Sequence, residues 1–320
     1  MQIDIHAHCW PDAYLDLLAS NGSGYTEPAR AMRAGDDDAA VSARLTAMDR
    51  AGLDLQVVSV LSQAPYHPDV DRATIAARLA NDHLVRLVRA HPDRLGAFGV
   101  LPLPHLDAAV TEAARVLDDG LAGVAVTGTI LGRTLADPEF LPLLAELDQR
   151  GAVLFVHPTG AGCGPHVDDH GLGWVIGAPL EDTITAVHLV RAGIPARFRN
   201  LQVIVCHLGG ALPALLNRID DKLGPAQDGT LPSDQFRRLW YDTVDHGSVP
   251  ALSCAVQTLG AGRLLLGTDY PFTTGTALDR CVSHIRRAEL ADTETARITG
   301  GNALGLLRGT RLPIPQAIRD

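Results

Sequence analysis

Eight short apolar segments recur along the 320-residue chain, separated by stretches with helical periodicity. Segments such as LQVVSVL at 55–61 are continuously apolar and β-branched, which is typical of parallel strands buried on both faces. The predicted strands span residues 2–6, 55–61, 95–103, 121–128, 152–158, 201–207, 239–243 and 263–272. The predicted helices include residues 42–52, 74–92, 107–120 and 138–151. At this length, the pattern predicts an α/β fold in which residues 1–320 form one closed, parallel (β/α)8 TIM barrel.

An open, doubly wound sheet is the alternative architecture. The phosphate-binding patterns usual after an early strand of such a sheet do not occur, and TGTILG at 127–132 fits neither spacing. Two long polar stretches interrupt the alternation: an insertion at 21–40 after the first strand, and residues 159–174 after the fifth. In a barrel, both would be loops at the carboxyl ends of the strands, where active sites form.

Charge and composition exclude several function classes. The net charge is −10, and no cluster of Lys and Arg is interleaved with aromatic residues, so nucleic acid is not an expected partner. No apolar run approaches the roughly 20 residues that span a bilayer, and the N-terminus does not resemble a signal peptide. Five widely spaced cysteines without a CxxC pair predict neither a disulfide framework nor a cysteine zinc site. We therefore expect a cytoplasmic protein that binds no membrane.

Polar residues occupy the predicted carboxyl ends of several strands. His6 and His8 end the first strand, and because side chains two residues apart share a face, both can point the same way. His157, His207 and Asp269 end the fifth, sixth and eighth strands. Strand ends meet on one face of a barrel, so these residues are expected to converge there. Three imidazoles and a carboxylate form a donor set suited to Zn²⁺.

Five motifs with these residues resemble one known family. DIHAH, FVHP, VIVCHLGG, LLLGTDYPF and the late ITGGNALGLL are together similar to the amidohydrolase superfamily, in its branch of aminocarboxymuconate semialdehyde decarboxylase-like enzymes. The resemblance extends from residue 4 to about residue 307, and it implies a barrel with one divalent ion, usually Zn²⁺ and in some members Mn²⁺. A binuclear centre is not expected, because no lysine lies near the end of the fourth strand.

The resemblance also assigns roles to residues of this chain. His6, His8, His157 and Asp269 match the family's metal ligands, and His207 matches the histidine that acts as a base or proton donor. Asp269 is also a second catalytic candidate, as a base.

Substrate contacts are predicted at five further positions. Arg218 matches an arginine that reaches a neighbouring subunit's active site in decarboxylases of this group, which implies a homodimer; the other reading is a solvated helix residue near two aspartates. Arg30 and Arg33 are candidates from the 21–40 insertion, because a guanidinium binds a carboxylate with two hydrogen bonds. Trp10 and Trp174 are expected either to wall an apolar pocket or to pack.

Three functions remain open from the sequence. The first is a metal-dependent lyase that decarboxylates a small carboxylated aromatic or muconate-like acid without oxidation, with His207 managing the proton. The second is a metal-dependent hydrolase that uses the same ligands to split an amide, lactone, ester or C–C bond. The third is a noncatalytic metal-binding barrel. In either enzyme, the expected partner is a small-molecule carboxylic acid.

Overall fold

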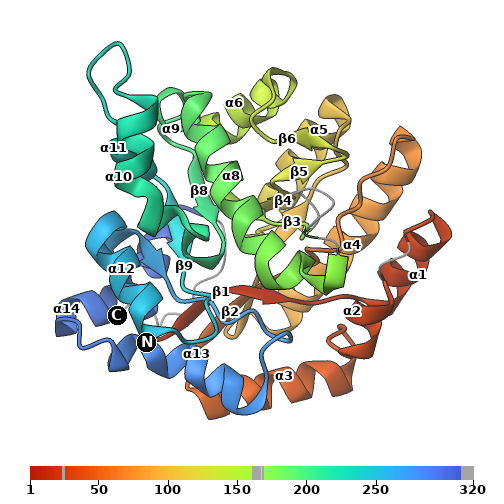
Figure 1. The fold of residues 1–320 in the computed structure, drawn as a ribbon. Helices are drawn as coiled ribbons and strands as arrows, with labels where there is room; N and C mark the ends of the chain where they lie inside the picture. Colours follow the sequence, from red (N-terminus) through yellow and green to blue (C-terminus); the bar gives the residue numbers. More distant parts are fainter. Residues whose placement is uncertain (24–25, 161–166, 168, 311–320) are drawn as a thin grey trace.

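The computed structural model describes residues 1–23, 26–160, 167 and 169–310. Eight parallel strands form one sheet in chain order, which closes into a (β/α)8 barrel surrounded by helices (Figure 1). The strands are β1 (Ile3–His8), β2 (Leu55–Ser59), β3 (Leu95–Val100), β4 (Gly123–Thr127), β7 (Val153–His157), β8 (Gln202–Val205), β9 (Trp240–Asp242) and β10 (Leu264–Leu265). The ring is completed by hydrogen bonds from the backbone N–H of Ile5 to Leu266 O, at 2.8 Å, and of His8 to Tyr270 O, at 2.7 Å.

The predicted barrel is confirmed, and the doubly wound alternative is wrong. Each predicted strand overlaps one strand of the barrel, although β1 extends two residues beyond the predicted 2–6. The prediction of a strand through residue 272 is wrong because β10 ends at Leu265. The chain still lies beside β1 at Leu266, and it then turns at Asp269, whose φ is 62°. This turn replaces the last part of the strand and directs the Asp269 side chain toward the end of β1.

Helices cover the outside of the barrel (Figure 1). They are α1 (Asp12–Ser20), α2 (Glu27–Ala31), α3 (Asp38–Ala51), α4 (Val70–Ala90), α5 (Leu106–Asp118), α6 (Leu141–Gln149), α8 (Ala178–Arg191), α9 (Ile194–Arg197), α10 (Leu212–Leu223), α11 (Pro232–Phe236), α12 (Val249–Leu259), α13 (Gly275–Arg287), α14 (Asp292–Ala296) and α15 (Asn302–Leu307). Their ends follow local chemistry. Asp37 caps α3 by accepting hydrogen bonds from two backbone N–H groups, and Gly52 ends that helix with a φ of 73°.

The 21–40 insertion is less irregular than expected. It contains α2, and its last residues already belong to α3, because the cap at Asp37 starts that helix earlier than the apolar pattern indicated. The second long loop, 159–174, lies partly outside the described residues. Its described end forms a turn at Asp169–Gly171 (η2) and the beginning of a helical turn at Gly173–Gly177 (η3).

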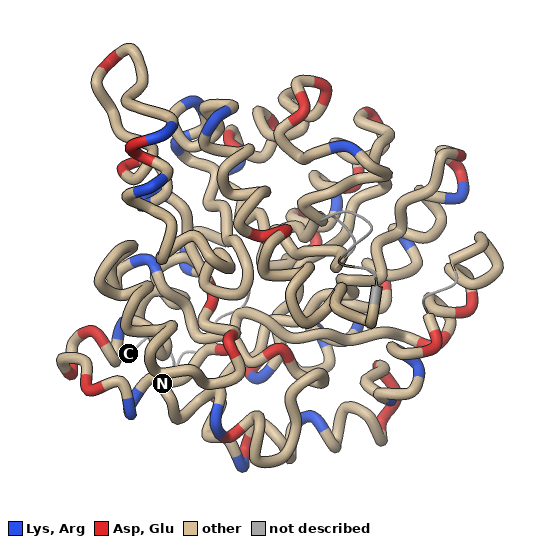
Figure 2. The backbone as a smooth tube through the Cα atoms, viewed as in Figure 1, with Lys and Arg blue, Asp and Glu red and all other residues tan. Residues whose placement is uncertain are grey.

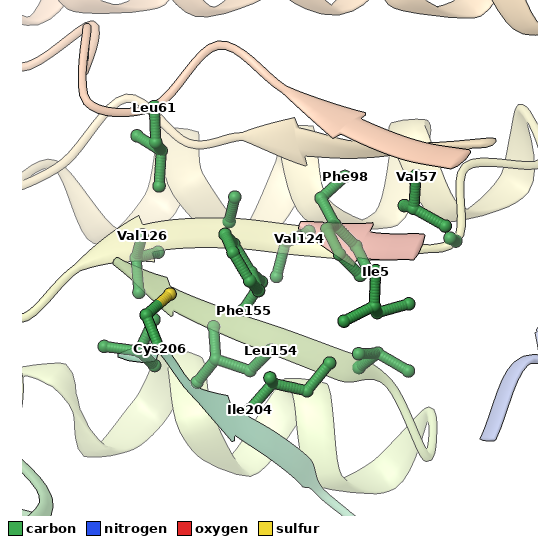
Figure 3. Packing of buried hydrophobic residues seen from close by; sticks show 14 of the residues in the cluster. Ile5, Val57, Leu61, Phe98, Val124, Val126, Leu154, Phe155, Ile204 and Cys206 are labelled. Carbon is green, nitrogen blue, oxygen red and sulfur yellow. The ribbon is translucent and has the colours of Figure 1, made fainter. Parts of the chain in front are cut away.

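The barrel interior is a packed apolar core. Phe98 of β3 and Phe155 of β7 stack with ring centroids 5.2 Å apart, among the buried side chains that Figure 3 draws. His6 lies against the edge of this core, because its ring centroid is 5.0 Å from that of Phe155. The apolar core therefore packs directly against the polar residues at the carboxyl ends of the strands.

Charged residues of both signs are interspersed along the helices and loops (Figure 2).

A short antiparallel hairpin follows β4 and consists of β5 (Thr129–Ile130) and β6 (Arg133–Thr134). Within the described part of the chain, none of the helices combines the length and the apolar character that crossing a membrane would require.

Candidate active site

Four buried side chains meet at the carboxyl ends of the strands. His6 and His8 come from β1, His157 from β7 and Asp269 from the turn after β10. Each offers one nitrogen or oxygen atom, and these four atoms all lie within 4.8 Å of one another. We call these four residues the donor cluster; the structure brings together the four that the sequence predicted to converge as ligands.

Hydrogen bonds outside the donor cluster orient its histidines. His6 Nδ1 lies 2.8 Å from Asp242 Oδ2, and His157 Nδ1 lies 2.7 Å from the carbonyl oxygen of Pro158. Each Nδ1 is therefore the donor, which leaves Nε2 of the neutral ring with a free lone pair. Such contacts are the usual way in which proteins fix metal-binding imidazoles.

Without a proton or a cation between them, the atoms inside the donor cluster would repel one another. His6 Nε2 and His8 Nε2 are 3.2 Å apart, and Asp269 Oδ1 lies 2.8 Å from the second and 3.3 Å from the first. Lone pairs and a carboxylate that converge in this way fit a bound cation. Imidazole and carboxylate donors together suit Zn²⁺, Mn²⁺ or a similar divalent ion.

The pKa values of the donor cluster are those expected of a site that binds a cation. Burial by itself lowers the pKa of His6, but Asp242 and Asp269 outweigh it and raise that pKa to about 10. Burial dominates at His8 and His157 and lowers their pKa, which favours neutral imidazoles. Burial opposes the ionisation of Asp269, yet its hydrogen bonds with His6 and His8 hold its pKa well below the usual range. The site thus attracts a positive charge, which a metal ion would supply in place of the proton.

Asp242, at the end of β9, orients neighbouring groups through hydrogen bonds. Its Oδ2 accepts from His6, while its Oδ1 accepts from the backbone N–H of His207 and of Val244, both at 3.0 Å. His6, Cys206 and Asp242 also offer atoms within 4.8 Å of one another. Burial raises the pKa of the Cys206 thiol well above its usual range, so this second set is a poorer donor set.

His207 lies beside the donor cluster and is held by a buried carboxylate. Its Nδ1 is 2.8 Å from Oδ2 of Asp182, which comes from α8. Burial lowers the pKa of His207, but Asp182 and Asp242 outweigh it and raise that pKa. The neighbouring Gly210 has a φ of 63°, and a Cβ there would meet the carbonyl oxygen of Pro179 at 1.8 Å, so the CHLGG motif needs this glycine.

A cavity of about 580 Å³ opens above the donor cluster. His157, His207 and Asp269 lie at its floor, and most of its wall is apolar. The described residues that line it are His157, Trp174, Val175, Ala178, Pro179, His207, Leu208, Gly210, Val244, Asp245, His246, Ala251, Asp269 and Phe272. None of these described residues is a lysine or an arginine, so the described wall offers no guanidinium or ammonium group to an acidic ligand.

The three predicted arginines lie elsewhere. Arg30 contacts Asp12 and Asp16 of α1, the nearest oxygen at 2.8 Å, and Arg33 is exposed on the same side of the barrel. Arg218 is exposed on α10 and forms no ion pair with a described residue. The structure therefore does not bring any of the three into the cavity of its own chain.

The two predicted tryptophans differ in position. Trp10 is buried and stacks on the His8 ring, with centroids 5.4 Å apart and planes 2° apart, and its Nε1 donates to Val60 O at 2.9 Å. It packs against a ligand candidate and is absent from the described cavity wall. Trp174 lines the cavity, with its ring centroid 6.2 Å from that of Phe272.

Sequence reasoning missed Arg44 of α3. It is 1% exposed, its Nη2 donates to the carbonyl oxygen of His8, and its guanidinium lies 4.8 Å from the Tyr270 ring centroid. Its Nη1 donates to Gln56 Oε1 at 2.6 Å. Its spacing was the signal for it, because Arg44 lies three residues after Val41 and four before Met48, on the buried face of α3. Arg44 supports the end of β1 from outside the cavity.

Residues 3–309 match the sequence model of the Amidohydro_2 family, described as amidohydrolase. The chain belongs to this amidohydrolase family.

Amidohydrolase relatives of known activity support the same grouping. The chain is 28% identical to 2-amino-3-carboxymuconate-6-semialdehyde decarboxylase of Dictyostelium discoideum, over 82% of this chain and 75% of that one. It is 27% identical to 6-methylsalicylic acid decarboxylase of Penicillium expansum, over 95% of both chains. The crystal structure of 5-carboxyvanillate decarboxylase from Sphingomonas paucimobilis superimposes with a TM-score of 0.85 at 25% identity, over 96% of this chain and 98% of that one.

Proposed function

We propose that this chain is a metal-dependent lyase that removes a carboxyl group, without oxidation, from a small aromatic or muconate-like acid. The donor cluster at the floor of a mostly apolar cavity is the observation that carries the proposal. Decarboxylases of 6-methylsalicylic acid and 5-carboxyvanillate are similar to the chain over almost its whole length, which supports the reaction type.

His6, His8, His157 and Asp269 would hold one divalent cation, with Zn²⁺ the first choice and Mn²⁺ the second. Two or three imidazoles with a carboxylate are the usual donors of catalytic zinc sites. When bound, the cation supplies a Lewis acid that attracts oxygen atoms of the substrate and stabilises negative charge.

His207 would deliver the proton. When the bond between the ring and the carboxyl carbon breaks, the electron pair stays on the ring carbon, CO₂ leaves, and one proton must take its place. The His207 side chain lines the cavity, and Asp182 accepts from its Nδ1, which leaves Nε2 to exchange a proton with the substrate. Asp182 acts through His207, as a positioning residue.

The apolar wall would hold the ring of the substrate and exclude water. Trp174, Val175 and Phe272 line the cavity opposite its polar floor, and we call these three residues the apolar rim. Aromatic side chains favour a flat, apolar ligand.

A homodimer would complete the recognition of the acid. The described cavity wall has no lysine or arginine, while Arg218 is exposed on α10 without an ion pair to a described residue. Ile176, Leu180 and Ile184 form an exposed apolar stripe on η3 and α8 next to the rim, which a second copy could cover. In such a dimer, Arg218 of one chain would bind the carboxylate in the cavity of the other.

The test is metal analysis of the purified protein, followed by incubation of the Zn²⁺- and Mn²⁺-loaded forms with a panel of aromatic acids and of their amides, esters and lactones. Release of CO₂ with formation of the decarboxylated ring supports the proposal. Formation of a new carboxylate without CO₂ would establish a hydrolase instead. Failure to bind metal, or no turnover of either kind, would leave the noncatalytic barrel.

A further inference from the structure

Glu181 of α8 is a buried acidic residue that takes no part in the donor cluster or in the proton transfer. It is 2% exposed and precedes Asp182 in the chain. Its Oε2 accepts three hydrogen bonds from the start of the loop after β7: from Thr159 N–H at 2.8 Å, from Thr159 Oγ1 at 2.9 Å and from Gly160 N–H at 3.1 Å. Removing a buried acceptor would leave these donors without it, which is costly. Glu181 therefore fixes the start of this loop.

Gly160 is the point at which η3 packs on the loop. Its φ is 77°, and a Cβ there would lie 3.2 Å from two atoms of the Trp174 ring, so the ring lies directly over the glycine. A Cβ at Gly173 would lie 2.9 Å from the Gly160 carbonyl oxygen, and a Cβ at Gly177 would lie 2.8 Å from it. Both ends of η3 thus approach Gly160 more closely than a side chain would allow. The position of Trp174 therefore depends on where Gly160 is held.

Trp174 links this packing to the cavity. It belongs to the apolar rim, and its ring centroid lies 6.2 Å from that of Phe272. Glu181 is absent from the described cavity wall, so its effect on a ligand would be indirect. The contacts run from Glu181 to Gly160, from Gly160 to the Trp174 ring, and from that ring to the cavity.

We propose that Glu181 is a positioning residue for substrate affinity: by holding Gly160, it keeps the Trp174 ring where it contacts the substrate. The inference rests on the proposed function in that the ligand of the cavity is a substrate. The donor cluster does not need Glu181, because His157 is fixed by the pairing of β7 with β4 and by its hydrogen bond to Pro158 O. Loss of Glu181 should therefore raise KM and leave metal content and kcat unchanged.

The first test observes Trp174 directly and does not depend on catalysis. The chain has three tryptophans, Trp10, Trp174 and Trp240, so protein labelled with 5-fluorotryptophan should give three fluorine NMR resonances. Trp174→Phe identifies the resonance of Trp174. Glu181→Ala should shift or broaden that resonance and leave the other two in place, whereas Glu181→Gln should restore it, because an amide oxygen can accept the same hydrogen bonds. Thr159→Val removes only the hydroxyl donor, so it should cause a smaller shift and replaces Glu181→Ala if that variant does not fold.

The second test measures the kinetics of the Zn²⁺-loaded protein with the aromatic acid that it turns over fastest. Glu181→Ala should raise KM about two- to tenfold, no more than Trp174→Ala does, with kcat unchanged. In the double variant Glu181→Ala/Trp174→Ala, KM should equal that of Trp174→Ala alone, because the ring that Glu181 positions is already absent.

Glu112→Ala is the matched control. Glu112 of α5 is also 2% exposed, and it accepts hydrogen bonds from Asn81 and Arg115, none of which lines the described cavity. Its loss should lower the Tm, as loss of Glu181 does, but it should leave KM and all three fluorine resonances unchanged. A general loss of stability is thereby distinguished from a displaced Trp174.

The outcomes separate this inference from the proposed function. An unmoved Trp174 resonance in Glu181→Ala, or no restoration by Glu181→Gln, would overturn the role of Glu181. KM effects that add in the double variant, or an equal rise of KM in Glu112→Ala, would overturn it as well. If the unchanged protein turned over none of the acids, the proposed function would be wrong, and the fluorine resonances would still decide whether Glu181 positions Trp174.

Discussion

The donor cluster and the apolar rim are two ends of one cavity, and they differ in how completely a single chain builds them. In the donor cluster, every residue is buried, and His6 and His157 are oriented by hydrogen bonds from the same chain. At the rim, Val175 is 69% exposed and Phe272 is 39% exposed, and the described wall has no lysine or arginine. One chain therefore supplies all four donors of the cluster, whereas its described cavity wall supplies no lysine or arginine for the carboxylate of an acid.

This difference separates two kinds of mutational effect. Substitutions at the floor should abolish metal binding or proton transfer. Strand register and buried hydrogen bonds fix these side chains, so no other donor can take their place. Changes at the rim should alter only substrate affinity, because its side chains contact solvent and have room to adjust. Variants at the two ends therefore test whether the floor and the rim have separate roles.

The largest effect is expected from loss of a donor. His157→Ala or Asp269→Ala should reduce bound metal well below one ion per chain, measured by elemental analysis after dialysis. Turnover should fall by more than the roughly 10- to 100-fold that is typical when a group that only supports a ligand is lost. His188→Ala removes an exposed histidine of α8 and should leave the metal content unchanged. Full occupancy in either donor variant would count against the ligand assignment.

The next effect is expected at His207. His207→Ala should reduce kcat by about 10²- to 10⁴-fold, the range for loss of a general acid or base, while metal content stays at the level of the unchanged protein. Asp182→Asn should cause a smaller loss, because the ring remains but is held less firmly. Loss of metal from His207→Ala would instead move this residue into the donor cluster.

The sequence predicts the floor better than the rim for a physical reason. Alternation in β1 indicated that His6 and His8 share a face, and the common edge of parallel strands indicated that His157 and Asp269 would join them. These rules depend only on strand geometry. They do not extend to the turn after Leu265, where the predicted strand is replaced by a bend at Asp269.

Residues on helices and loops needed the tertiary structure. Asp182 lies on α8, and nothing in its local sequence indicates that it meets His207. Arg30 forms ion pairs with Asp12 and Asp16, away from the cavity. The sequence did not indicate these pairs, because they depend on how α1 and α2 pack together.

A third, intermediate effect tests whether a second chain completes the rim. Arg218→Ala should reduce kcat/KM by about 10- to 100-fold, as loss of a charge-assisted hydrogen bond to a carboxylate predicts. Mixing Arg218→Ala chains with His207→Ala chains under exchanging conditions should then restore activity. About a quarter of the sites would combine an intact His207 with the arginine of the other chain. Unchanged activity in Arg218→Ala, or no recovery on mixing, would contradict a shared site.

The smallest effect is expected at the rim itself. Trp174→Ala removes an aromatic wall and should raise KM by about two- to tenfold, which corresponds to a contact of roughly 0.5–1.5 kcal/mol. Metal content and kcat should not change, because Trp174 belongs to η3 and supplies no atom to the donor cluster. Val70→Ala removes an exposed apolar side chain at the start of α4 and should leave KM unaltered. If Trp174→Ala lowers metal occupancy as well, the rim supports the floor, and the two ends of the cavity are not independent.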